Sequence, residues 1–563
     1  MKKLSFSLLL MLGLFATVFV SCKDDDDEPP LLAPVIADID PEEGPVGTPM
    51  TITGANFGGD PIVNFGSTEA TISASSTTSI TTSVPTGLAA GAVQVTVTND
   101  GKTSGGTTFT VTEEGGGETT TRVDITDADL EAGQTYNWTA DNEYFLSGLV
   151  FLEEGGVLNI EEGTTIRFTE ETGADNTSAL IISRGAQIEA IGTADAPIIF
   201  TSEADTANAN LLPTDNGQWG GLILLGNAPT EKGGATSGIN IEGIDSSNPR
   251  GTYGGTAPDD DSGTLQYVSI RYTGVGIAPN SEIQGLTLGG VGSGTTLDHI
   301  DIYSSNDDGV EIFGGTVNLS YISVAFATDD SFDFDEGWRG SAQYLFAIQL
   351  EGGEEEYDQV GEWDGAVPDD AALFAAPNLF NATLIGPGQS STGAQRALLL
   401  RDGFAGKLGN SILEDFPGVA IQVEDRQDDE SDSYGRLQTA AGDYQLEIMN
   451  NTFAVFGGST DLASLIQATE GEDEGYVGET DALVAELTDN SNIYSADPVL
   501  TSISRATDGG LDPRPAAATD ATVAVPAGDG FIQATEYRGA FAPGEATWIS
   551  GWTTLAQLGY LSE

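Results

Sequence analysis

The stretch LDHIDIYSSNDDGVEIFGG (297–315) is followed by LSYISVAFATDDSFDFDEG (319–337), and the two align without a gap at a spacing of 22 residues. Apolar residues coincide along the alignment, and so do the acid pairs that begin at Asp307 and Asp329. A fixed period of this length is typical of a solenoid, in which each repeat stacks on the next. Each unit alternates apolar and polar residues and has turns but no helical pattern, so we predict a parallel β-helix.

The same spacing relates GVLNIEEGTTIRF (156–168) to SALIISRGAQIEA (178–190), where Leu158 aligns with Leu180. The 563-residue chain contains 73 glycines and 39% hydrophobic residues, as expected for many short strands joined by turns. We therefore predict an all-β protein in which the β-helix occupies residues 121–563.

Several segments depart from the repeat. Insertions such as 243–263 interrupt the period, and insertions of this kind gather on one face of a solenoid, often the binding face. Asparagines that begin three later segments are expected to stack on one another, namely Asn381, Asn410 and Asn451. The tryptophan-rich segment 537–561 is expected to cover the open end of the solenoid, which is otherwise an unpaired edge. Helical patterns are confined to 481–489 and 553–561.

Residues 33–112 alternate apolar and polar positions between proline and glycine turns, which predicts a β-sandwich. The segment resembles the IPT/TIG family of immunoglobulin-like domains through Pro34, Ile39, Pro41, Gly44, Gly47, Thr51, Ile52, Gly54, Asn56 and Phe57. In surface proteins that resemblance implies a spacer. The glycine-rich segment 113–120 then reads as a linker.

The first 21 residues have two lysines, an apolar stretch and a small residue before Cys22, which are features of a secretory signal peptide. The ending FVSC resembles a bacterial lipobox, in which the cysteine is lipidated, although Phe19 departs from the usual pattern. The acidic tether at 22–32 begins CKDDDDE and resembles the export signal of Bacteroidota surface lipoproteins. The resemblance implies a chain anchored in the outer membrane through Cys22 and exposed on the cell surface.

Composition excludes several classes of function. A formal net charge of −68 repels nucleic acid and anionic membranes, and we attribute most of it to adaptation to a saline habitat. The chain has one histidine, and its single cysteine is the one expected to be lipidated, so Cys–His catalysis and a zinc site are excluded. His299 reads as an ordinary strand residue, and neither a Walker A nor a Rossmann fingerprint occurs.

The β-helix segment itself resembles a family of bacterial surface and secreted proteins that carry a pectin-lyase-like right-handed parallel β-helix. The stretches that carry the resemblance lie in 145–350, among them SALIISRGAQIEAIGTADAPIIFTS, GQWGGLILLGNAP and DDSFDFDEGWRG. Together with the C-terminal stretch it covers most of 140–563. The resemblance implies the fold more than a chemistry, because pectin-lyase-like folds host lyases and hydrolases but fold does not fix function.

The acids of the opening stretch form the main candidate site, comprising Asp307, Asp308, Asp329, Asp330, Asp333 and Asp335. Neighbouring coils lie about 4.8 Å apart, so residues 22 positions apart are expected to stack. Three interpretations stay open: the acids cap turns by accepting backbone N–H groups, they bind Ca²⁺ through hard oxygen ligands, or they act as an acid–base pair on a glycosidic bond.

Nearby residues bear on these alternatives. Arg339 is a candidate ligand-binding residue, and it also offers internal charge compensation to Asp335 or Glu336. Trp338, Trp219 and Trp363 offer aromatic surface for stacking on sugars, or else belong to the solenoid core. We expect a surface lipoprotein that binds carbohydrate or another surface component, with Ca²⁺ as a structural ion. The alternative is a polysaccharide lyase or glycoside hydrolase, which a groove with two converging carboxylates and a basic residue would favour.

Overall fold

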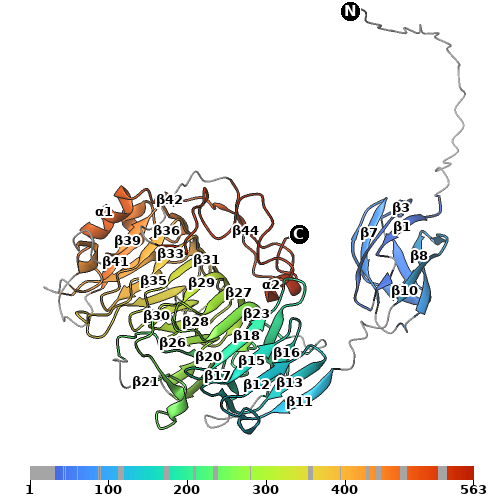
Figure 1. Cartoon of the computed structure of the whole chain (residues 1–563). Coiled ribbons are helices and arrows are strands. Elements are labelled where there is room, and N and C mark those ends of the chain that lie inside the picture. The colour runs from blue at the N-terminus through green and yellow to red at the C-terminus, as the bar shows by residue number, and fades with distance from the viewer. Residues whose placement is uncertain are drawn as a thin grey trace, which may run out of the picture. The chain divides into compact units, whose positions relative to one another are not determined.

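The structure is a computed structural model, and it divides the chain into two compact units, residues 1–119 and 120–563 (Figure 1). It describes residues 32–562 apart from 42, 45, 60, 86–87, 89–90, 112–119, 170–176, 207–210, 233–238, 279–280, 353–358, 393–394, 427–430, 439–444, 470–477 and 518–528. Cys22, the signal segment and most of the tether and linker therefore lie outside the described residues. Among the described residues, no helix has the length and apolar character needed to cross a bilayer.

The N-terminal unit is the predicted sandwich. One sheet has the order β1-β3-β7-β6, with strands at Val35–Asp40, Pro49–Ala55, Ser79–Ser83 and Ile72–Ser75. The other has the order β2-β10-β8-β4-β5 with β9 beside β8, at Glu43–Gly44, Thr107–Val111, Gly91–Asn99, Ile62–Phe65, Thr68–Ala70 and Lys102–Thr103. Alternate residues such as Ile52, Val95 and Phe109 fill the core between the sheets, as the alternation predicts.

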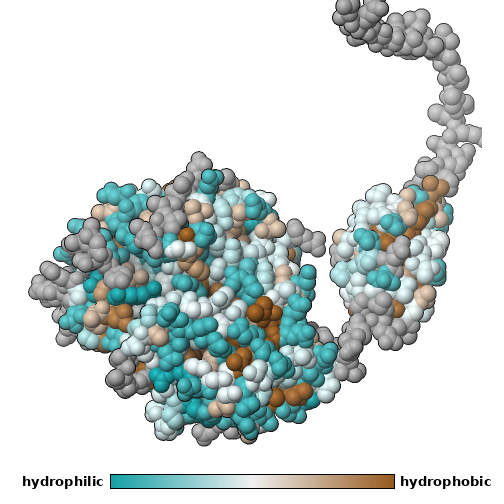
Figure 2. Space-filling model, viewed as in Figure 1, coloured by the Kyte–Doolittle hydropathy of each residue, from teal (hydrophilic) through white to brown (hydrophobic). Residues whose placement is uncertain are grey.

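The second unit is a parallel β-helix built on a ten-stranded and an eighteen-stranded sheet. The ten-stranded sheet runs β14, β17, β20, β26, β28, β30, β32, β35, β38, β41, at Leu149–Leu152, Ala179–Ile182, Leu222–Leu225, Leu286–Gly289, Val310–Phe313, Phe332–Asp335, Gly361–Asp364, Arg396–Arg401, Val419–Glu424 and Ile466–Thr469. Inward side chains from successive coils form one continuous apolar core. Figure 2 shows a visible face that is mainly hydrophilic, as the composition predicts.

In the eighteen-stranded sheet, one long strand in some coils takes the place of two short strands in others, so the sheet covers two faces of the solenoid. Its first strands are β11, β12, β13, β15, β16, β18 and β19, at Thr121–Ile125, Thr135–Trp138, Asn142–Leu146, Val157–Ile160, Thr165–Phe168, Gln187–Ile191 and Ile198–Ser202. The four long strands β23, β27, β29 and β31 follow at Gly263–Thr273, Thr296–Ser305, Asn318–Ala325 and Ser341–Ile348. The last are β33, β34, β36, β37, β39, β40 and β42, at Asn378–Phe380, Thr383–Ile385, Lys407–Gly409, Ile412–Phe416, Glu447–Met449, Thr452–Phe456 and Ile493–Ser495.

Shorter elements lie in the connections between coils and in the C-terminal region. Two-stranded sheets pair β21 with β22, β24 with β25 and β43 with β44, at Ile239–Asn240, Thr252–Tyr253, Val275–Ala278, Ser281–Ile283, Leu500–Ser502 and Asp512–Pro515. The helices are α1 at Asp481–Asp489 and α2 at Thr554–Gln557, with 3₁₀ turns η1 at Asp127–Asp129, η2 at Pro249–Gly251, η3 at Gly435–Gln438 and η4 at Leu462–Leu465. The helix predicted at 481–489 is confirmed, whereas that at 553–561 shortens to one turn.

The 22-residue register is confirmed for the stretch that predicted the fold. Leu297 in β27 pairs with Leu319 in β29, and Val310 in β28 pairs with Phe332 in β30. The alignment of 156–168 with 178–190 gave a wrong stacking, because Leu158 in β15 pairs with Ile188, which is 30 residues away. That alignment matched strand–turn–strand units on different faces of the solenoid, which share the same alternation.

The bend of the eighteen-stranded sheet is marked by a column of residues with positive φ. Tyr267, His299, Tyr321 and Tyr344 stack ring on ring, with centroids 4.4 to 4.6 Å apart. The column continues as Asn381, Asn410 and Asn450, so two of the three predicted stacking asparagines are right. Asn451 instead stacks one position over, where it accepts from the Ser411 N–H and donates to the Asn492 side chain.

The C-terminal segment lies along the side of the solenoid and not over its end, so the predicted end cap is wrong. Trp548 and Trp552 pack edge-on against His299 and Tyr267 at the bend, and the N–H of Thr554 donates to Asp301 in β27. The edge strand β39 is covered by helix α1 instead. The Glu486 carboxylate accepts from the N–H of Ile448 at that edge, so a backbone group of the open strand is satisfied.

Candidate metal centre

The predicted acid pairs meet in two stacked loops of the β-helix. Asp307 and Asp308 lie between β27 and β28, and Asp329 lies one coil further, between β29 and β30. Because the strands on both sides of these loops keep the 22-residue register, the loops stack as well. One carboxylate oxygen from each of the three acids lies within 4.8 Å of the others.

A second group of acids adjoins the first and shares Asp308 with it. Oxygens of Asp308, Glu311 and Asp333 also lie within 4.8 Å of one another. Glu311 and Asp333 are partners in the β28–β30 pairing, and Asp333 pairs in turn with Glu362 of β32. Three successive coils therefore place an acid at one position of the ten-stranded sheet. Their neighbours Ile312 and Phe334 point into the core, so this acid column lies on the outer face.

Although it is on the outer face, much of the cluster is buried. Asp308 is 7% exposed and Glu311 6%, while Asp329 is exposed and Asp307 intermediate. Burial, followed by repulsion from Asp329, raises the pKa of Asp307 to about 8. Burial and neighbouring carboxylates likewise raise the pKa of Asp308, Glu311 and Asp333 well above the usual range. The cluster is therefore most exposed to solvent at Asp329, while Asp308 and Glu311 are buried.

The turn-cap interpretation holds for part of the cluster. Oδ1 of Asp308 accepts the N–H of Asp330 at 2.9 Å, which ties the two loops together. Other oxygens lack such partners: among the described residues, Oε2 of Glu311, Oδ1 of Asp330 and Oδ1 of Asp333 are buried and receive no hydrogen bond. A buried carboxylate oxygen without a donor is costly, so turn capping alone does not explain these acids.

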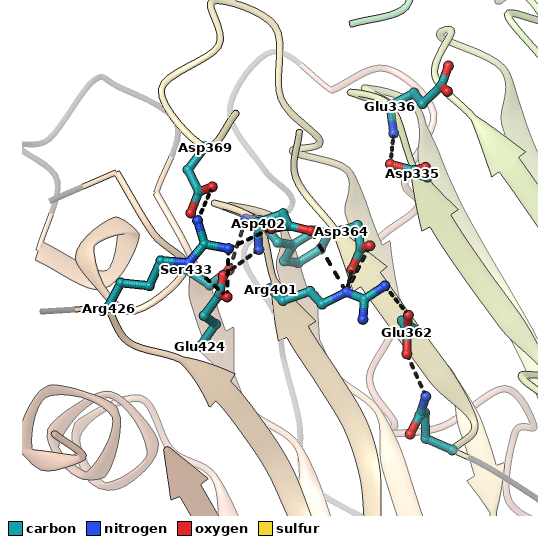
Figure 3. Close-up of polar contacts among 12 residues, drawn as sticks. Asp335, Glu336, Glu362, Asp364, Asp369, Arg401, Asp402, Glu424, Arg426 and Ser433 are labelled. Atoms are coloured by element: carbon teal, nitrogen blue, oxygen red, sulfur yellow. Dashed lines mark hydrogen bonds and ion pairs between the residues drawn. The ribbon is translucent and has the colours of Figure 1, made fainter. Parts of the chain in front are cut away.

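The acids further along the same sheet are neutralised by arginines, as Figure 3 shows. Arg401 forms ion pairs with Glu362 and with Asp364, the latter at 2.8 Å. Arg426 reaches Asp369 at 2.7 Å, and it also pairs with Asp402 at 3.0 Å and Glu424 at 2.9 Å. The protein therefore supplies its own cations to these acids.

Within the described part of the chain, five acids of this region have no such arginine. Neither Lys nor Arg forms an ion pair there with Asp307, Asp308, Glu311, Asp330 or Asp333, and the electrostatic neighbours that shift their pKa values are acids. A dense group of acids without a built-in cation must keep protons or bind a cation from solution.

The geometry fits a calcium ion. Calcium binds oxygens at about 2.3–2.6 Å, so two oxygens on one ion can lie up to about 5 Å apart. Both acid groups satisfy that limit, and three carboxylates with water can complete six to eight ligands. When bound, the ion would supply the positive charge that the surrounding residues lack. Asp307, Asp308 and Asp329 would hold one ion, and Glu311 with Asp333 would extend the site along the outer face of the ten-stranded sheet.

The predicted set of site residues needs two changes. Asp335 and Glu336 are paired with Lys232, whose Nζ lies 3.6 and 3.1 Å from their carboxylates, so they have a counter-ion. Arg339 donates its Nε to the carbonyl oxygen of Phe374. Glu311 was missed although it lies 22 residues before Asp333, a spacing that is visible in the sequence.

The three tryptophans predicted as a sugar platform belong to the core. Trp219 stacks on Phe168 with ring centroids 3.7 Å apart and is 1% exposed. Trp338 is fully buried, and Trp363 is 4% exposed and stacks on Phe334. The platform prediction is wrong because all three side chains are buried: Trp363 points inward from β32, and Trp219 and Trp338 pack into the core from the connections between strands.

Comparisons with known proteins bear on both units. The family model of the pectate-lyase like beta helix domain matches residues 131–481, and that of the IPT/TIG domain matches residues 34–111. No curated protein matches the chain.

Similar solved structures include a gamma-CGTase from the alkalophilic Bacillus clarkii, with 32% identity, a TM-score of 0.14, and coverage of 17% of this chain and 14% of that chain. An auxiliary nutrient binding protein from Bacteroides thetaiotaomicron has 26% identity, a TM-score of 0.14, and coverage of 16% and 22%. The catalytic unit of a GH87 alpha-1,3-glucanase from Streptomyces thermodiastaticus has 9% identity, a TM-score of 0.23, and coverage of 81% and 86%. The chain spans less than a quarter of the first two proteins, and TM-scores this low support no functional argument.

The family match over residues 131–481 agrees with the stacked coils described above. With more than half of its length matched, the chain belongs to the pectate-lyase like beta-helix family, and an IPT/TIG domain precedes its β-helix.

Proposed function

We propose that this protein is a lipid-anchored surface protein whose β-helix binds calcium at Asp307, Asp308 and Asp329 and binds carbohydrate or another surface component. The leader and Cys22 support anchoring, and the net charge of −68 fits a cation-rich exterior. The IPT/TIG domain would act as the spacer between the membrane and the β-helix.

The main support for calcium binding is a difference between two groups of acids on the ten-stranded sheet. Acids around Arg401 and Arg426 have guanidinium partners, whereas the cluster centred on Asp308 has buried carboxylate oxygens without donors. Oxygen ligands at this density favour a hard cation, and the loose geometry of calcium suits loops better than the strict octahedron of magnesium.

Calcium should raise the melting temperature of the chain from residue 30 onward, which keeps every described residue. A bound ion stabilises only the folded state, by about 2.7 kcal/mol when its concentration is a hundredfold above Kd. The Asp307→Asn, Asp329→Asn double variant should show a much smaller shift between chelator and calcium. Differential scanning calorimetry measures both.

The matched control is Asp195→Asn, Asp259→Asn, which removes two charges from exposed acids outside both groups. It should keep the wild-type shift. If wild-type protein melts at the same temperature in chelator and in millimolar calcium, the acids act as turn caps and the calcium proposal fails.

Catalysis is the second candidate, because an acid whose pKa is raised to about 8 lies beside the exposed Asp329. Such a pair could protonate a glycosidic oxygen and activate water. Release of reducing ends or unsaturated products from a polysaccharide, abolished by Asp307→Asn in a chain that still melts normally, would favour this candidate over binding.

Membrane anchoring should depend on Cys22 and surface exposure on the four aspartates after Lys23. Cys22→Ala should release the protein from membranes or leave its precursor uncleaved. Replacing Asp24 to Asp27 with Ala should keep lipidation but reduce removal by protease shaving of whole cells. Equal shaving of this variant and of the wild type would contradict surface export through the acidic run.

A further inference from the structure

A cavity of about 400 Å³ lies at one corner of the early coils, and no acid of the cluster around Asp308 lines it. Its floor comes from the turns that follow β14, β17 and β20, which contribute Glu153 and Glu154, then Ser183 to Gly185, then Asn227. The insertion at 243–263 supplies the remaining wall through Pro249, Arg250 and Thr252. Insertion 243–263, which was expected to border a binding face, thus forms one wall of a concave surface.

The wall of the cavity is fixed in place by polar contacts. Arg250 pairs with Asp127 at 2.8 Å, and its guanidinium lies 3.9 Å from the ring centroid of Phe151. The Ser183 hydroxyl donates to the carbonyl oxygen of Arg250 at 3.0 Å. Because the insertion is tied to two different coils, the cavity is preformed, and binding would not require it to be ordered first.

Arg184 is the unusual residue of this cavity. Other arginines of the early coils form ion pairs: Arg122 with Asp124, Arg167 with Glu143, and Arg250 with Asp127. Arg184 donates from Nη1 to the carbonyl oxygen of Gly254 at 2.9 Å, and within the described ranges no carboxylate forms an ion pair with it. In a chain with 87 acids and 19 Lys and Arg residues, such an arginine retains donors that face the cavity without a carboxylate acceptor.

The hydrogen-bond acceptors that line the cavity beside Arg184 indicate which class of ligand it would bind. Glu153, Glu154 and Asn227 line the same cavity and present side-chain oxygens. A hydroxyl group both donates and accepts, so vicinal hydroxyls can accept from the guanidinium fork and donate to these oxygens. The lining carries Arg184 and Arg250 as well as the two glutamates, and Arg250 pairs with Glu153 at 3.4 Å, so the charges of the lining balance. A ligand with a full negative charge would still be repelled by the net charge of −68, which favours a neutral ligand.

We propose that this cavity binds a neutral saccharide unit, in which Arg184 bridges two neighbouring hydroxyl oxygens and Glu153 and Glu154 accept hydroxyl hydrogens. The volume lies in the range of small-ligand sites and suits a single sugar residue or the end of a chain. The inference rests on the carbohydrate part of the proposed function and gives it a location, independent of calcium.

Saturation-transfer NMR with the chain from residue 30 onward tests the site. The probes are neutral hexoses, pentoses and deoxyhexoses, short oligomers of each, and the corresponding uronic acids. At least one neutral saccharide should receive saturation, and Arg184→Gln should weaken its binding about tenfold or more, because hydrogen bonds from a charged donor are lost. The matched control Arg122→Gln removes the same charge from an exposed arginine outside the cavity and should bind like the wild type.

Each contrary outcome identifies what fails. If a neutral saccharide binds equally to Arg184→Gln and wild type, the cavity assignment is wrong while carbohydrate binding stands. Tighter binding of a uronic acid than of its neutral counterpart overturns the ligand class, and conversion of the saccharide during the experiment overturns binding without catalysis. If no saccharide receives saturation, the carbohydrate part of the proposed function fails with the inference, whereas the calcium part is decided separately by the melting experiment.

Discussion

Replacing Trp338 with Ala should lower the free energy of unfolding of the β-helix by about 3–5 kcal/mol, as for other large-to-small changes at fully buried aromatics. Trp338 has no exposed surface, and its ring centroid lies 4.6 Å from that of Phe334. Its Nε1 donates to the carbonyl oxygen of Val317 at 3.0 Å, so the substitution also leaves a buried acceptor without a donor. Urea unfolding followed by tryptophan fluorescence and circular dichroism measures the change.

Trp338→Phe is the matched control, and it should cost clearly less because the aromatic packing is largely kept. The core assignment also predicts that Trp338→Ala, at a temperature where it stays folded, binds saccharide as the wild type does. Unchanged stability together with lost sugar binding would contradict the buried position and restore the idea of an exposed sugar platform.

In chelator, the β-helix should lose stability as the pH rises from about 5 to about 8. Burial raises the pKa of Asp307 to about 8 and that of Glu242 to about 7, and it raises the pKa of Asp308 and Glu311 in the same direction. The groups that face Asp307 are themselves acids, namely Asp308, Asp329, Glu242 and Glu282. Within this window the folded chain holds protons that the unfolded chain has already released, so stability must fall as the pH increases.

The sign of this dependence separates the cluster from the ordinary acids. Carboxyls with lowered pKa values, such as Asp129 and Asp512, contribute stability that is lost only on acidification to about pH 4 and below. Melting temperatures at pH 5 and pH 8 therefore report on the cluster.

An Asp308→Asn, Glu311→Gln variant should flatten the dependence and melt above the wild type at pH 8 in chelator. Saturating calcium should reverse the slope in the wild type, because the ion binds the deprotonated acids. Equal wild-type melting temperatures at the two pH values in chelator would mean that the acids are not desolvated.

The fold could be predicted from the sequence where one signal, the regular spacing of apolar residues, was enough to decide it. The repeat from 297 to 337 fixes the strand register, since inward apolar residues must stack on one another to stay buried. The same signal misled at 156–190, because strands on different faces alternate in the same way and spacing alone does not say which face a strand occupies. Direct neighbours there are separated by 30 residues.

The site was predicted in part for a similar reason. Register placed Asp307 over Asp329, but the side chains that gather around an ion depend on burial and on competing cations from distant segments. Lys232 pairs with Asp335, which was predicted to belong to the cluster, and with its neighbour Glu336, and no spacing in the sequence predicts that contact. The tryptophans were ambiguous for another reason: an aromatic side chain suits either a sugar platform or the core, and the sequence does not show whether the ring is buried.

Calorimetric titration of the metal-free chain tests most simply whether the cluster around Asp308 holds calcium. At pH 8 we expect saturable binding of at least one calcium ion per chain, abolished or much weakened in Asp307→Asn, Asp329→Asn and unchanged in Asp195→Asn, Asp259→Asn. At pH 6, titrations in two buffers of different ionisation enthalpy should reveal protons released as the ion displaces them from the acids. No heat of binding at either pH, with no calcium retained after dialysis, would mean that the cluster does not bind calcium.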